Sequence, residues 1–367
     1  MRVVMISKAL VVAAYQRKCE EIAAHPDIDL TVVVPTAWAG QRYEPGFLHG
    51  YKTLVEPIRF DGKFHLFYFP TLGRMLRDLR PDIVHVDEEP YNLATVLATR
   101  QALAVGARPI FFTWQNLHRR YPPPFRWFEQ YVYRRSRLAI AGNAEAVDVL
   151  RAKGYAGPSR VIPQFGVDPE LFAPATDPPN RSGQPFTIGN VGRFTPEKGL
   201  SVLLDAVASL PGDWRLRLIG AGDMRDELQA RAAALGIAGR VSLEPYVPST
   251  EVPARLRELD ALVLPSLTTP RWKEQFGRIL QEAMACGVPV VGSDSGEIPH
   301  VVGDTGLIVP EGDAAALSAA LTRLASSADL RHDLAQRGRR RVLERFTHAS
   351  IAAQTAQAYR DVYAGSA

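Results

Sequence analysis

Two cations in the second half of the chain have the type and spacing needed to bind phosphate. Arg193 and Lys198 lie in the stretch "GRFTPEKG", next to Gly192 and just ahead of a helix predicted to begin near Leu200. Two cations beside the exposed N–H groups of a helix start suit a diphosphate. A solvated loop whose charges face water is the simpler interpretation of an isolated pair, so the rest of the sequence must decide.

Two glutamates bracket the start of a second predicted helix, in "EQFGRILQEAMACGVPVV". Glu282 lies inside this helix, predicted over 278–285, and its two acceptor oxygens match the vicinal hydroxyls of a ribose. Gly277 lies at the helix start, where backbone N–H groups are exposed. Glu274 precedes it. A carboxylate near a helix start is also stabilised by the helix dipole without any ligand.

Glycines follow another predicted strand in "LIGAGD", at Gly220 and Gly222. Backbone without a Cβ lets a ligand approach closely, although one Gly-x-Gly is a weak signal. The first strand is followed by no Gly-x-Gly-x-x-Gly, and the sequence contains no Walker loop. Hydride transfer by a dinucleotide and ATP hydrolysis therefore lack their phosphate cradles.

Short β-branched segments alternate with helical stretches along the whole chain. The predicted strands are 3–6, 30–34, 83–86, 110–113 and 138–141, and then 186–191, 216–219, 241–243, 261–264, 288–291 and 307–309. Between the two sets, the proline-rich "APATDPPNRSGQP" reads as a linker. The pattern predicts an α/β protein with two tandem Rossmann-like domains, 1–173 and 174–349. Parallel sheets bind ligands beyond the carboxyl ends of their strands, so we expect the site there.

Composition limits the function classes. The 367 residues exceed what one core usually organises, and the net charge of +4 is too mild to indicate nucleic acid. Two cysteines, Cys19 and Cys286, exclude a disulfide framework and suit a reducing interior. No apolar run reaches the length of a membrane span, so we expect a cytoplasmic protein, soluble or peripherally attached.

The stretch from Arg119 to Arg137, "RRYPPPFRWFEQYVYRRSR", mixes aromatic residues with arginines. This composition is compatible with peripheral contact to an anionic membrane. An ordinary helix, with its aromatics in the core and its arginines in water, is the preferred interpretation.

The ordered set of motifs resembles the retaining GT-B glycosyltransferases of family 4, which transfer a sugar from a nucleotide-sugar to an acceptor. The motifs are "GRFTPEKG", "ELDALVLPS", the Glu-x7-Glu pair, "SGEIPHVV" and "TGLIVPEGD", with looser matches in "PDIVHVD" and "VIPQFGVDPELF". The resemblance implies two Rossmann-like domains facing across a cleft. It also implies a last helix, about 350–367, that returns to the first domain. The apolar stripe of this helix would bury Tyr359 there.

The resemblance also implies roles for the residues above. Arg193 and Lys198 would hold the departing diphosphate. Glu274 would face the hydroxyls of the transferred sugar, and Glu282 the ribose. The remaining donor-binding positions would be Gly192, Gly220, Gly222, Gln275, Phe276 and Gly277.

Two departures from the family pattern concern the first domain. The glycine pair usual after the first strand is replaced by "SKALVVAAYQRK", where Lys8, with Ser7, could substitute at the donor phosphate. The usual histidine is replaced by Gln115 and Asn116, which leaves His118 as the candidate for contact with the sugar. His85, at the end of its strand, is a second candidate. The acidic residues 87–89 are expected to contact the acceptor or water, and no metal site is expected.

These observations predict a metal-independent, retaining hexosyltransferase with a UDP- or GDP-sugar as substrate and no cofactor. The acceptor, a lipid, a saccharide or a small molecule, would bind the first domain. A nucleotide-sugar-binding protein without catalysis, or a nucleotide-sugar epimerase of the same fold, remains the alternative. Glycoside hydrolysis is disfavoured, because Glu274 and Glu282 are better explained by donor binding than as an acid and a nucleophile.

Overall fold

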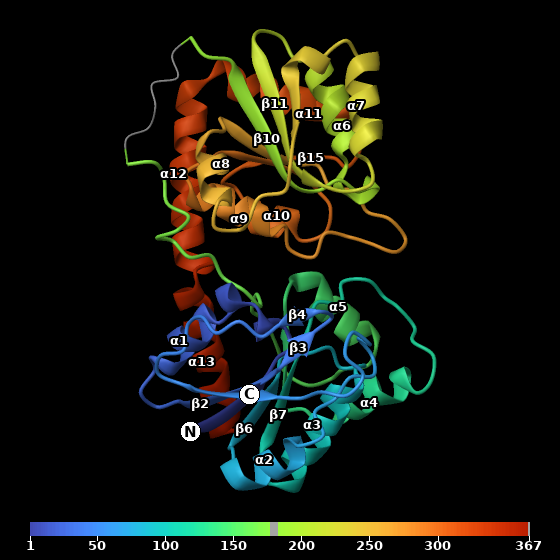
Figure 1. Ribbon diagram of the computed structural model, residues 1–367, viewed down its shortest axis with the longest axis vertical. Coiled ribbons are helices and arrows are strands. Elements are labelled where there is room, and N and C mark those ends of the chain that lie inside the picture. Colours follow the sequence, from blue (N-terminus) through green and yellow to red (C-terminus); the bar gives the residue numbers. More distant parts are fainter. Residues whose placement is uncertain (177–182, 366–367) are drawn as a thin grey trace. The chain divides into compact units, whose positions relative to one another are not determined.

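The computed structural model describes residues 1–176 and 183–365 and divides into two compact units (Figure 1). Unit 1 contains residues 1–166 and the chain from His348 onward, and unit 2 contains residues 167–347. The units therefore divide after Gly166 rather than at residue 173, and the described parts of the predicted linker belong to unit 2. The centre of that linker, residues 177–182, lies outside the described residues.

Unit 1 is built on a seven-stranded, fully parallel sheet with the order β5-β2-β1-β6-β7-β8-β9. Its strands are β1 Arg2–Ile6, β2 Asp29–Pro35, β5 Lys52–Glu56, β6 Ile83–Val86, β7 Arg108–Thr113, β8 Leu138–Ala141 and β9 Ser159–Val161. Its helices are α1 Arg17–Ala23, α2 Leu72–Leu79, α3 Leu93–Ala104, α4 Phe125–Arg135, α5 Ala144–Ala152 and α13 His348–Ala364, with 3-10 turns η1 Ala9–Val11 and η2 Ala13–Tyr15. A small hairpin joins β3 Ala37–Trp38 and β4 Gln41–Arg42.

Unit 2 repeats this plan with six parallel strands in the order β12-β11-β10-β13-β14-β15. Its strands are β10 Phe186–Arg193, β11 Trp214–Ala221, β12 Val241–Glu244, β13 Ala261–Leu264, β14 Val290–Ser293 and β15 Leu307–Val309. Its helices are α6 Leu200–Ala208, α7 Arg225–Ala234, α8 Val252–Arg257, α9 Arg278–Ala285, α10 Ile298–Val302, α11 Ala314–Ser326 and α12 Ala328–Arg345, with 3-10 turns η3 Pro196–Lys198 and η4 Ala238–Arg240. The prediction of two Rossmann-like domains is confirmed.

The central strands are apolar throughout because helices cover both faces of each sheet. Alternate residues of β1 enter different cores: Val3 and Met5 pack with residues of α1 and α13, whereas Val4 and Ile6 pack with residues of α2 and α3. The sequence does not predict β5 and β9. Both are edge strands whose residues are half-buried or exposed, so they lack the apolar signature of a central strand.

The last helix, α13, packs on unit 1 beside α1, as predicted (Figure 1). Its apolar stripe is buried in the same core as β1, and Tyr359 is completely buried there. The Tyr359 hydroxyl lies 2.7 Å from Nδ1 of His85 in β6. A helix distant in sequence therefore completes the core of unit 1 and hydrogen-bonds to a central strand.

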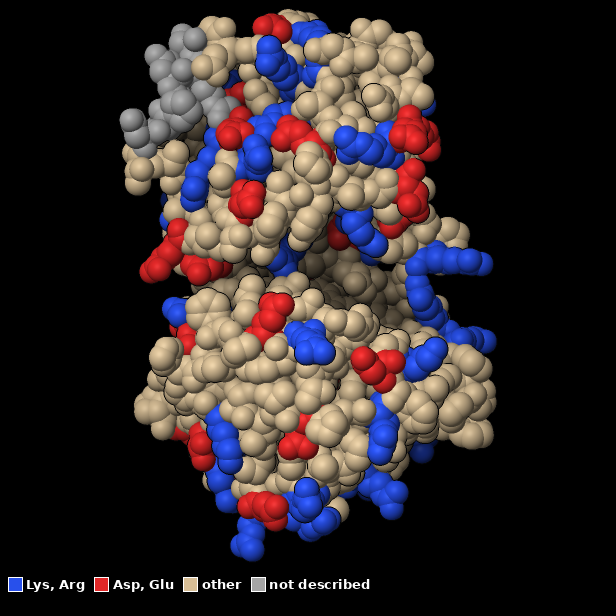
Figure 2. Space-filling model, in the orientation of Figure 1, with Lys and Arg blue, Asp and Glu red and all other residues tan. Residues whose placement is uncertain are grey.

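The surface charges agree with the near-even composition. On the face shown in Figure 2, basic and acidic side chains are interspersed within each unit rather than gathered into one large patch of a single sign. In α4, Tyr133 is buried in the core, but Trp127 is 66% exposed beside the exposed Arg126. The expectation that the aromatics of this helix lie in the core therefore holds for Tyr133 and fails for Trp127.

Removing the Tyr359 ring should destabilise unit 1. We expect Tyr359→Ala to lower the free energy of unfolding of unit 1 by about 3–5 kcal/mol, because it leaves a cavity and removes the partner of His85. Tyr363→Ala, on the exposed side of the same helix, should change it by no more than about 0.5 kcal/mol. Both changes in the free energy of unfolding can be measured by urea titration, with hydrogen exchange of the unit 1 amides as the readout. Equal effects of the two substitutions would show that α13 does not stabilise unit 1.

Candidate active site

The strand order of unit 2 defines a switch point between β10 and β13. From β10 the chain first continues to β11 and β12 on one side, and then returns to add β13, β14 and β15 on the other. The loops that leave the carboxyl ends of β10 and β13 therefore diverge, and ligands of parallel sheets bind in the crevice at such a point. Arg193 ends β10, and Ser266 follows β13.

A compact polar cluster lies at this switch point. The Lys198 ammonium, on η3, donates to Oε2 of Glu274 at 2.6 Å, and Ser266 Oγ donates to the same oxygen at 2.8 Å. Ser266 is fully buried and Glu274 is 7% exposed. The fold thus brings together the predicted cation and the predicted carboxylate, which are 76 residues apart. Ser266 is an additional member that the sequence analysis did not assign.

Arg193 is placed differently from Lys198. Its side chain is 67% exposed, and its guanidinium lies 3.8 Å from the Glu197 carboxylate. A long, solvated cation at the end of β10 can turn towards an anion without first leaving a buried partner. Gly192, just before it, has open space where a Cβ would point, so its backbone is accessible to a ligand.

Gly220 and Gly222 have a packing reason for being glycine. A Cβ on Gly220 would lie 1.8 Å from the carbonyl oxygen of Gly192, and one on Gly222 would lie 2.4 Å from that of Phe194. The end of β11 therefore packs directly against the end of β10. The need for glycine at these two positions follows from this contact alone, without a ligand.

The Glu-x7-Glu segment divides between the core and the surface. Glu282 is 7% exposed on α9, where it accepts a hydrogen bond from Arg278 Nε at 2.9 Å, and burial raises its pKa. Phe276 is 9% exposed, and the centre of its ring lies 6.0 Å from that of Phe346. Gln275 is exposed. Gly277 starts the helix in the left-handed conformation, at φ +70°.

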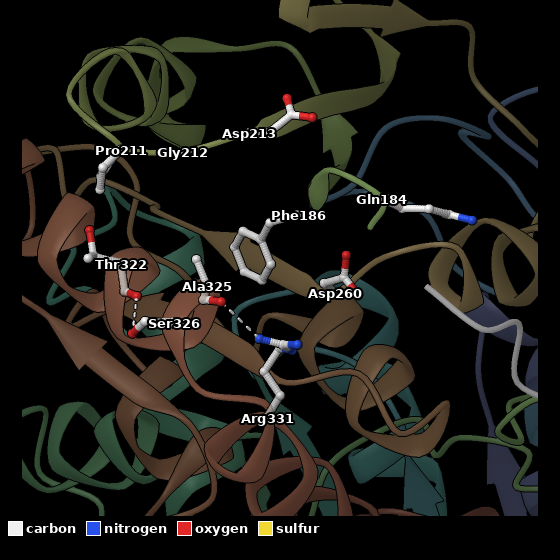
Figure 3. Close-up of a pocket in the computed structure, with 10 residues that line it drawn as sticks. All are labelled: Gln184, Phe186, Pro211, Gly212, Asp213, Asp260, Thr322, Ala325, Ser326 and Arg331. Atoms are coloured by element: carbon white, nitrogen blue, oxygen red, sulfur yellow. Dashed lines mark hydrogen bonds between the residues drawn. The ribbon is translucent and has the colours of Figure 1, made fainter. Parts of the chain in front are cut away.

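A separate pocket of about 390 Å³ opens at the amino ends of the unit 2 strands (Figure 3). Phe186, the first residue of β10, lines it, and Arg331 lies over the Phe186 ring at 5.7 Å. The Arg331 guanidinium also donates to the carbonyl oxygens of Leu324 and Ala325 at the end of α11. This pocket lies at the amino ends of the strands, so it is separate from the switch-point cluster.

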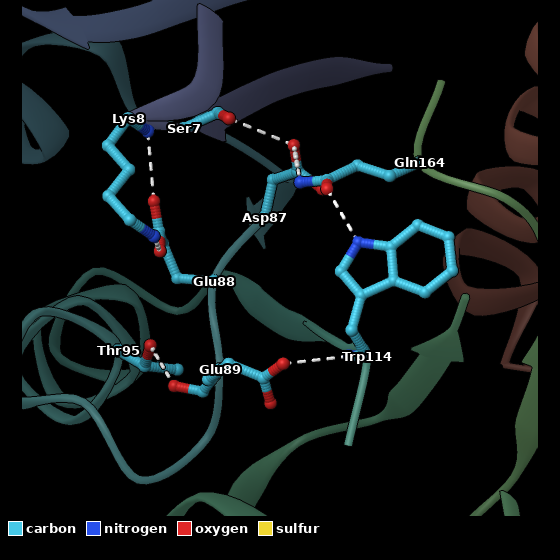
Figure 4. A network of polar contacts seen from close by, with 8 residues as sticks. All are labelled: Ser7, Lys8, Asp87, Glu88, Glu89, Thr95, Trp114 and Gln164. Atoms are coloured by element: carbon cyan, nitrogen blue, oxygen red, sulfur yellow. Dashed lines mark hydrogen bonds and ion pairs between the residues drawn. The ribbon is translucent and has the colours of Figure 1, made fainter. Parts of the chain in front are cut away.

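Unit 1 has a corresponding switch point between β1 and β6, where several buried carboxylates gather (Figure 4). Asp87 and Glu88 are each 2% exposed and Glu89 is 9% exposed, so these side chains are buried from water, and their contact with an acceptor stays a prediction. Asp87 accepts from Ser7 Oγ at 2.9 Å and from Gln164 Nε2 at 3.0 Å. Burial would raise the pKa of Asp87, but Lys18, His85 and these hydrogen bonds together lower it.

Lys8 takes part in the same network. Its backbone N–H donates to Glu88 at 2.9 Å and its ammonium forms an ion pair with the same carboxylate. The ammonium also lies 4.5 Å from the ring of Phe64 and within 5.4 Å of the rings of Trp38 and Phe67. Lys8 was predicted to approach the donor phosphate. In this structure a carboxylate and three rings of unit 1 surround it instead.

Glu89 links β6 to the loop after β7. It accepts from Thr113 Oγ1 and from the backbone N–H of Trp114, both at 2.7 Å, while Trp114 Nε1 donates to Gln164 Oε1 at 2.8 Å. Burial raises the pKa of Glu89 to about 7 despite these hydrogen bonds. The carboxyl group can therefore change protonation near neutral pH.

The two candidate histidines lie in contrasting places. His118 is exposed on the loop after β7. His85 is 2% exposed, and burial lowers its pKa to about 4. Its Nδ1 contacts Tyr359, so α13 packs against the imidazole. In this arrangement His118 is accessible to a ligand, and His85 belongs to the core of unit 1.

Ser266, Trp114 and Gln164 take part in these networks although no role was predicted for them from the sequence. Ser266 ends "ELDALVLPS", a motif noted for its family resemblance but given no role, so its place after a buried strand was an available signal. Trp114 and Gln164 meet across 50 residues, and no local pattern predicts that contact.

The described residues, 1–176 and 183–365, contain neither a metal-binding group of side chains nor a helix suited to cross a membrane. No group of three or more His, Cys, Asp or Glu side chains there is arranged to hold a metal ion. None of the helices in these ranges combines the length and apolar character needed to cross a bilayer.

The raised pKa of Glu89 makes the stability of unit 1 depend on pH. From about pH 4.5 to about 7 the unfolded chain has lost a proton that the folded chain retains, so stability falls as pH rises. We expect Glu89→Gln to remove this loss of stability. Its amide oxygen can still accept from the Trp114 N–H, and its amide N–H can donate to Thr113 Oγ1. Between about pH 4.5 and about 7, the free energy of unfolding of the Glu89→Gln variant should rise relative to that of the unmodified protein by up to about 1.4 kcal/mol per pH unit.

Urea unfolding of unit 1 at several pH values measures this difference. Asp148→Asn, on the exposed side of α5, is the control and should give a flat difference. A flat difference for Glu89→Gln as well would mean that Glu89 ionises in the folded protein as it does in the unfolded chain.

Comparison with known proteins agrees with this architecture. The family model "Glycosyltransferase Family 4" matches residues 19–171, and the model "Glycosyl transferases group 1" matches residues 175–341. A sucrose-phosphate synthase from Thermosynechococcus elongatus has the same fold, with a TM-score of 0.74, 20% identity and coverage of 100% of both chains.

The curated relatives of this chain include mannosyltransferases. An MMP alpha-(1->4)-mannosyltransferase from Mycolicibacterium hassiacum is 32% identical over 234 residues, which are 62% of this chain and 54% of the relative. A GDP-mannose-dependent alpha-(1-6)-phosphatidylinositol monomannoside mannosyltransferase from Mycolicibacterium smegmatis is 33% identical over 180 residues, 45% of this chain and 47% of the relative. The chain spans about half the length of the curated relatives it matches. With both domain models matched in order and a Rossmann-like parallel sheet in each unit, the chain belongs to the family 4 glycosyltransferases.

Proposed function

We propose that this protein is a retaining hexosyltransferase that moves a hexose from a UDP- or GDP-sugar to an acceptor hydroxyl. The observation that carries the proposal is the cluster at the unit 2 switch point. There Lys198, Glu274 and Ser266 contact one another, and the exposed Arg193 ends the neighbouring strand. The donor would bind unit 2, and the acceptor would bind unit 1.

In the proposed reaction, the bond between the anomeric carbon and the diphosphate oxygen breaks and a bond to the acceptor oxygen forms. The nucleoside diphosphate leaves with additional negative charge, and the proton of the acceptor hydroxyl passes to an oxygen of the leaving diphosphate or to water. Lys198 and Arg193 would stabilise that charge, because preorganised cations act most strongly where charge develops. Glu274 accepts hydrogen bonds at Oε2 from Lys198 and Ser266, and in the proposed reaction its carboxylate would also accept a hydrogen bond from a sugar hydroxyl.

The donor nucleotide and the acceptor class remain proposals. The name of the Mycolicibacterium smegmatis relative specifies GDP-mannose, which supports a GDP-sugar, and a UDP-sugar is the alternative. The same name specifies a phosphatidylinositol mannoside acceptor, which supports a lipid or saccharide here. The exposed Trp127 and Arg126 of α4 are compatible with peripheral attachment of a cytoplasmic protein to a membrane that carries such an acceptor.

Two other functions fit a nucleotide-sugar site on this fold. A protein that binds the donor without catalysis is favoured by the engagement of Lys8 with Glu88, which leaves the first loop without a free cation for phosphate. An epimerase would use the same donor site and need no acceptor. The three possibilities differ in whether nucleoside diphosphate is released, and in whether an acceptor increases that release.

A single assay tests the proposal. The protein is incubated with a panel of UDP- and GDP-sugars, with lipid and saccharide acceptors, in buffer containing a chelator, and nucleoside diphosphate release is followed. We expect release that rises with acceptor, resists the chelator and gives a product with the donor's anomeric configuration by NMR. Binding without release supports the non-catalytic alternative, and a new free sugar without acceptor supports the epimerase. Strict dependence on added Mg²⁺ or Mn²⁺ would refute metal independence.

Replacement of either cation should reduce turnover much more than stability. Because Arg193 and Lys198 would stabilise the leaving diphosphate, we expect Arg193→Ala and Lys198→Ala each to lower kcat/KM by about 30- to 1,000-fold, or about 2–4 kcal/mol. Arg215→Ala is the matched control, since Arg215 is an exposed arginine near the amino end of the neighbouring strand β11. Unchanged turnover in both cation variants would refute the assignment.

A further inference from the structure

The loop between β13 and Glu274 has a structure that the proposed roles do not explain. Its residues 267–273 connect Ser266 to Glu274, the two side chains that meet in the switch-point cluster. Trp272, partly buried in this loop, places its ring 4.8 Å from the Lys198 ammonium. Lys198 therefore has an indole as well as the Glu274 carboxylate beside its charged group.

The loop is held in one conformation by hydrogen bonds to its own residues. Thr269 and Trp272 form a narrow turn: Thr269 N donates to the Trp272 carbonyl at 2.8 Å, and Trp272 N donates to Thr269 Oγ1 at 2.9 Å. This turn fixes the backbone from which the indole projects.

The loop is also held by neighbouring elements of unit 2. Thr268 Oγ1 donates to Glu311 at 2.6 Å, and the Glu311 N–H in turn donates to Asp294 at 2.8 Å, which ties the loop to the ends of β14 and β15. The Leu267 N–H donates to the carbonyl of Glu197 at 2.8 Å, on the 3-10 turn that carries Lys198. The indole and the lysine are thus mounted on backbones that are hydrogen-bonded to each other.

A lysine needs such support to act on a fixed point in space. Its four-carbon stem has many rotamers, and one ion pair to a carboxylate leaves much of that freedom. An aromatic face attracts an ammonium through its quadrupole, more strongly where water is excluded. The Lys198 side chain is 15% exposed, so the contact with Trp272 lies in a largely desolvated place.

We propose that Trp272 is a positioning residue for the reaction: its ring holds the Lys198 ammonium against Glu274, where it meets the leaving diphosphate. This inference rests on the proposed function. In this proposal the turn formed by Thr269 and Trp272, which follows β13, fixes the position of a lysine that follows β10. Trp272 itself acts through Lys198 and does not have to touch the donor.

Replacement of the ring tests the proposal through the steady-state constants. We expect Trp272→Leu to lower kcat about tenfold with a change in donor KM below about threefold, because the misplaced ammonium costs more in the transition state than in the ground state. Trp272→Phe, which keeps an aromatic face, should stay within about threefold of the unmodified enzyme. Tyr363→Leu, at the exposed tyrosine of α13, controls for loss of an aromatic ring elsewhere and should leave both constants unchanged.

The dependence on Lys198 separates positioning from general support of the loop. In a Lys198→Ala background, Trp272→Leu should cause less than about a twofold further loss of kcat, since the group it positions is absent. A full tenfold loss in that background would overturn the proposal, as would equal losses for Trp272→Phe and Trp272→Leu.

A readout without turnover keeps this test independent of the proposed function. In protein labelled with ¹³C-lysine, the Lys198 Cε resonance, identified by its absence in Lys198→Arg, should carry the ring-current shift of the indole. It should lose that shift in Trp272→Leu and retain part of it in Trp272→Phe. If no donor supports turnover but the shift behaves in this way, the proposed function fails while the Trp272 contact with Lys198 stands. An unchanged Cε shift in Trp272→Leu overturns the inference whatever the activity.

Discussion

The ion pair between Lys198 and Glu274 is the interaction that the candidate site depends on. Lys198 lies on the 3-10 turn after β10, and Glu274 lies on the loop after β13. They meet because the carboxyl ends of all strands of a parallel sheet lie on the same side. The loops that follow β10 and β13 turn in opposite directions, which leaves a crevice between them at the carboxyl ends of the strands. Ser266 and the loop after it complete the carboxylate's surroundings. The strand order of unit 2 therefore determines which side chains can meet in the candidate site.

Unit 1 uses the same geometry for a different purpose. Its switch point gathers three carboxylates, and burial would make each of them costly if it were unpaired. The structure offsets this cost with two lysines, a serine, a threonine and a glutamine, and holds Glu89 at a pKa of about 7. The cations at this edge are thus engaged with carboxylates of the same unit, whereas Arg193 of unit 2 extends into solvent. This contrast supports placing the anionic donor on unit 2.

The last helix contributes to unit 1 through burial rather than through the site. Tyr359 fills the core beside β1 and β6 and hydrogen-bonds to His85, a residue that the sequence offered as a candidate for contact with the sugar. The same contact that stabilises unit 1 therefore encloses one of the two histidines. His118 remains accessible because it is exposed on the loop that follows β7.

The local residue pattern was sufficient to predict the bounds of strands and helices that are largely buried. The buried strands 83–86, 138–141 and 261–264 and the helix 278–285 have the predicted bounds, because apolar runs and helical periodicity report burial directly. The edge strands β5 and β9 escaped prediction because half-exposed residues carry no such signal. For the site, the sequence determined which residue types were present at the strand ends. The tertiary structure decided that Lys198 meets Glu274, that Lys8 is paired with Glu88, and that Gly220 is required by a neighbouring strand. Each of these contacts joins segments far apart in the chain, so strand order and packing create it and local residue patterns cannot specify it.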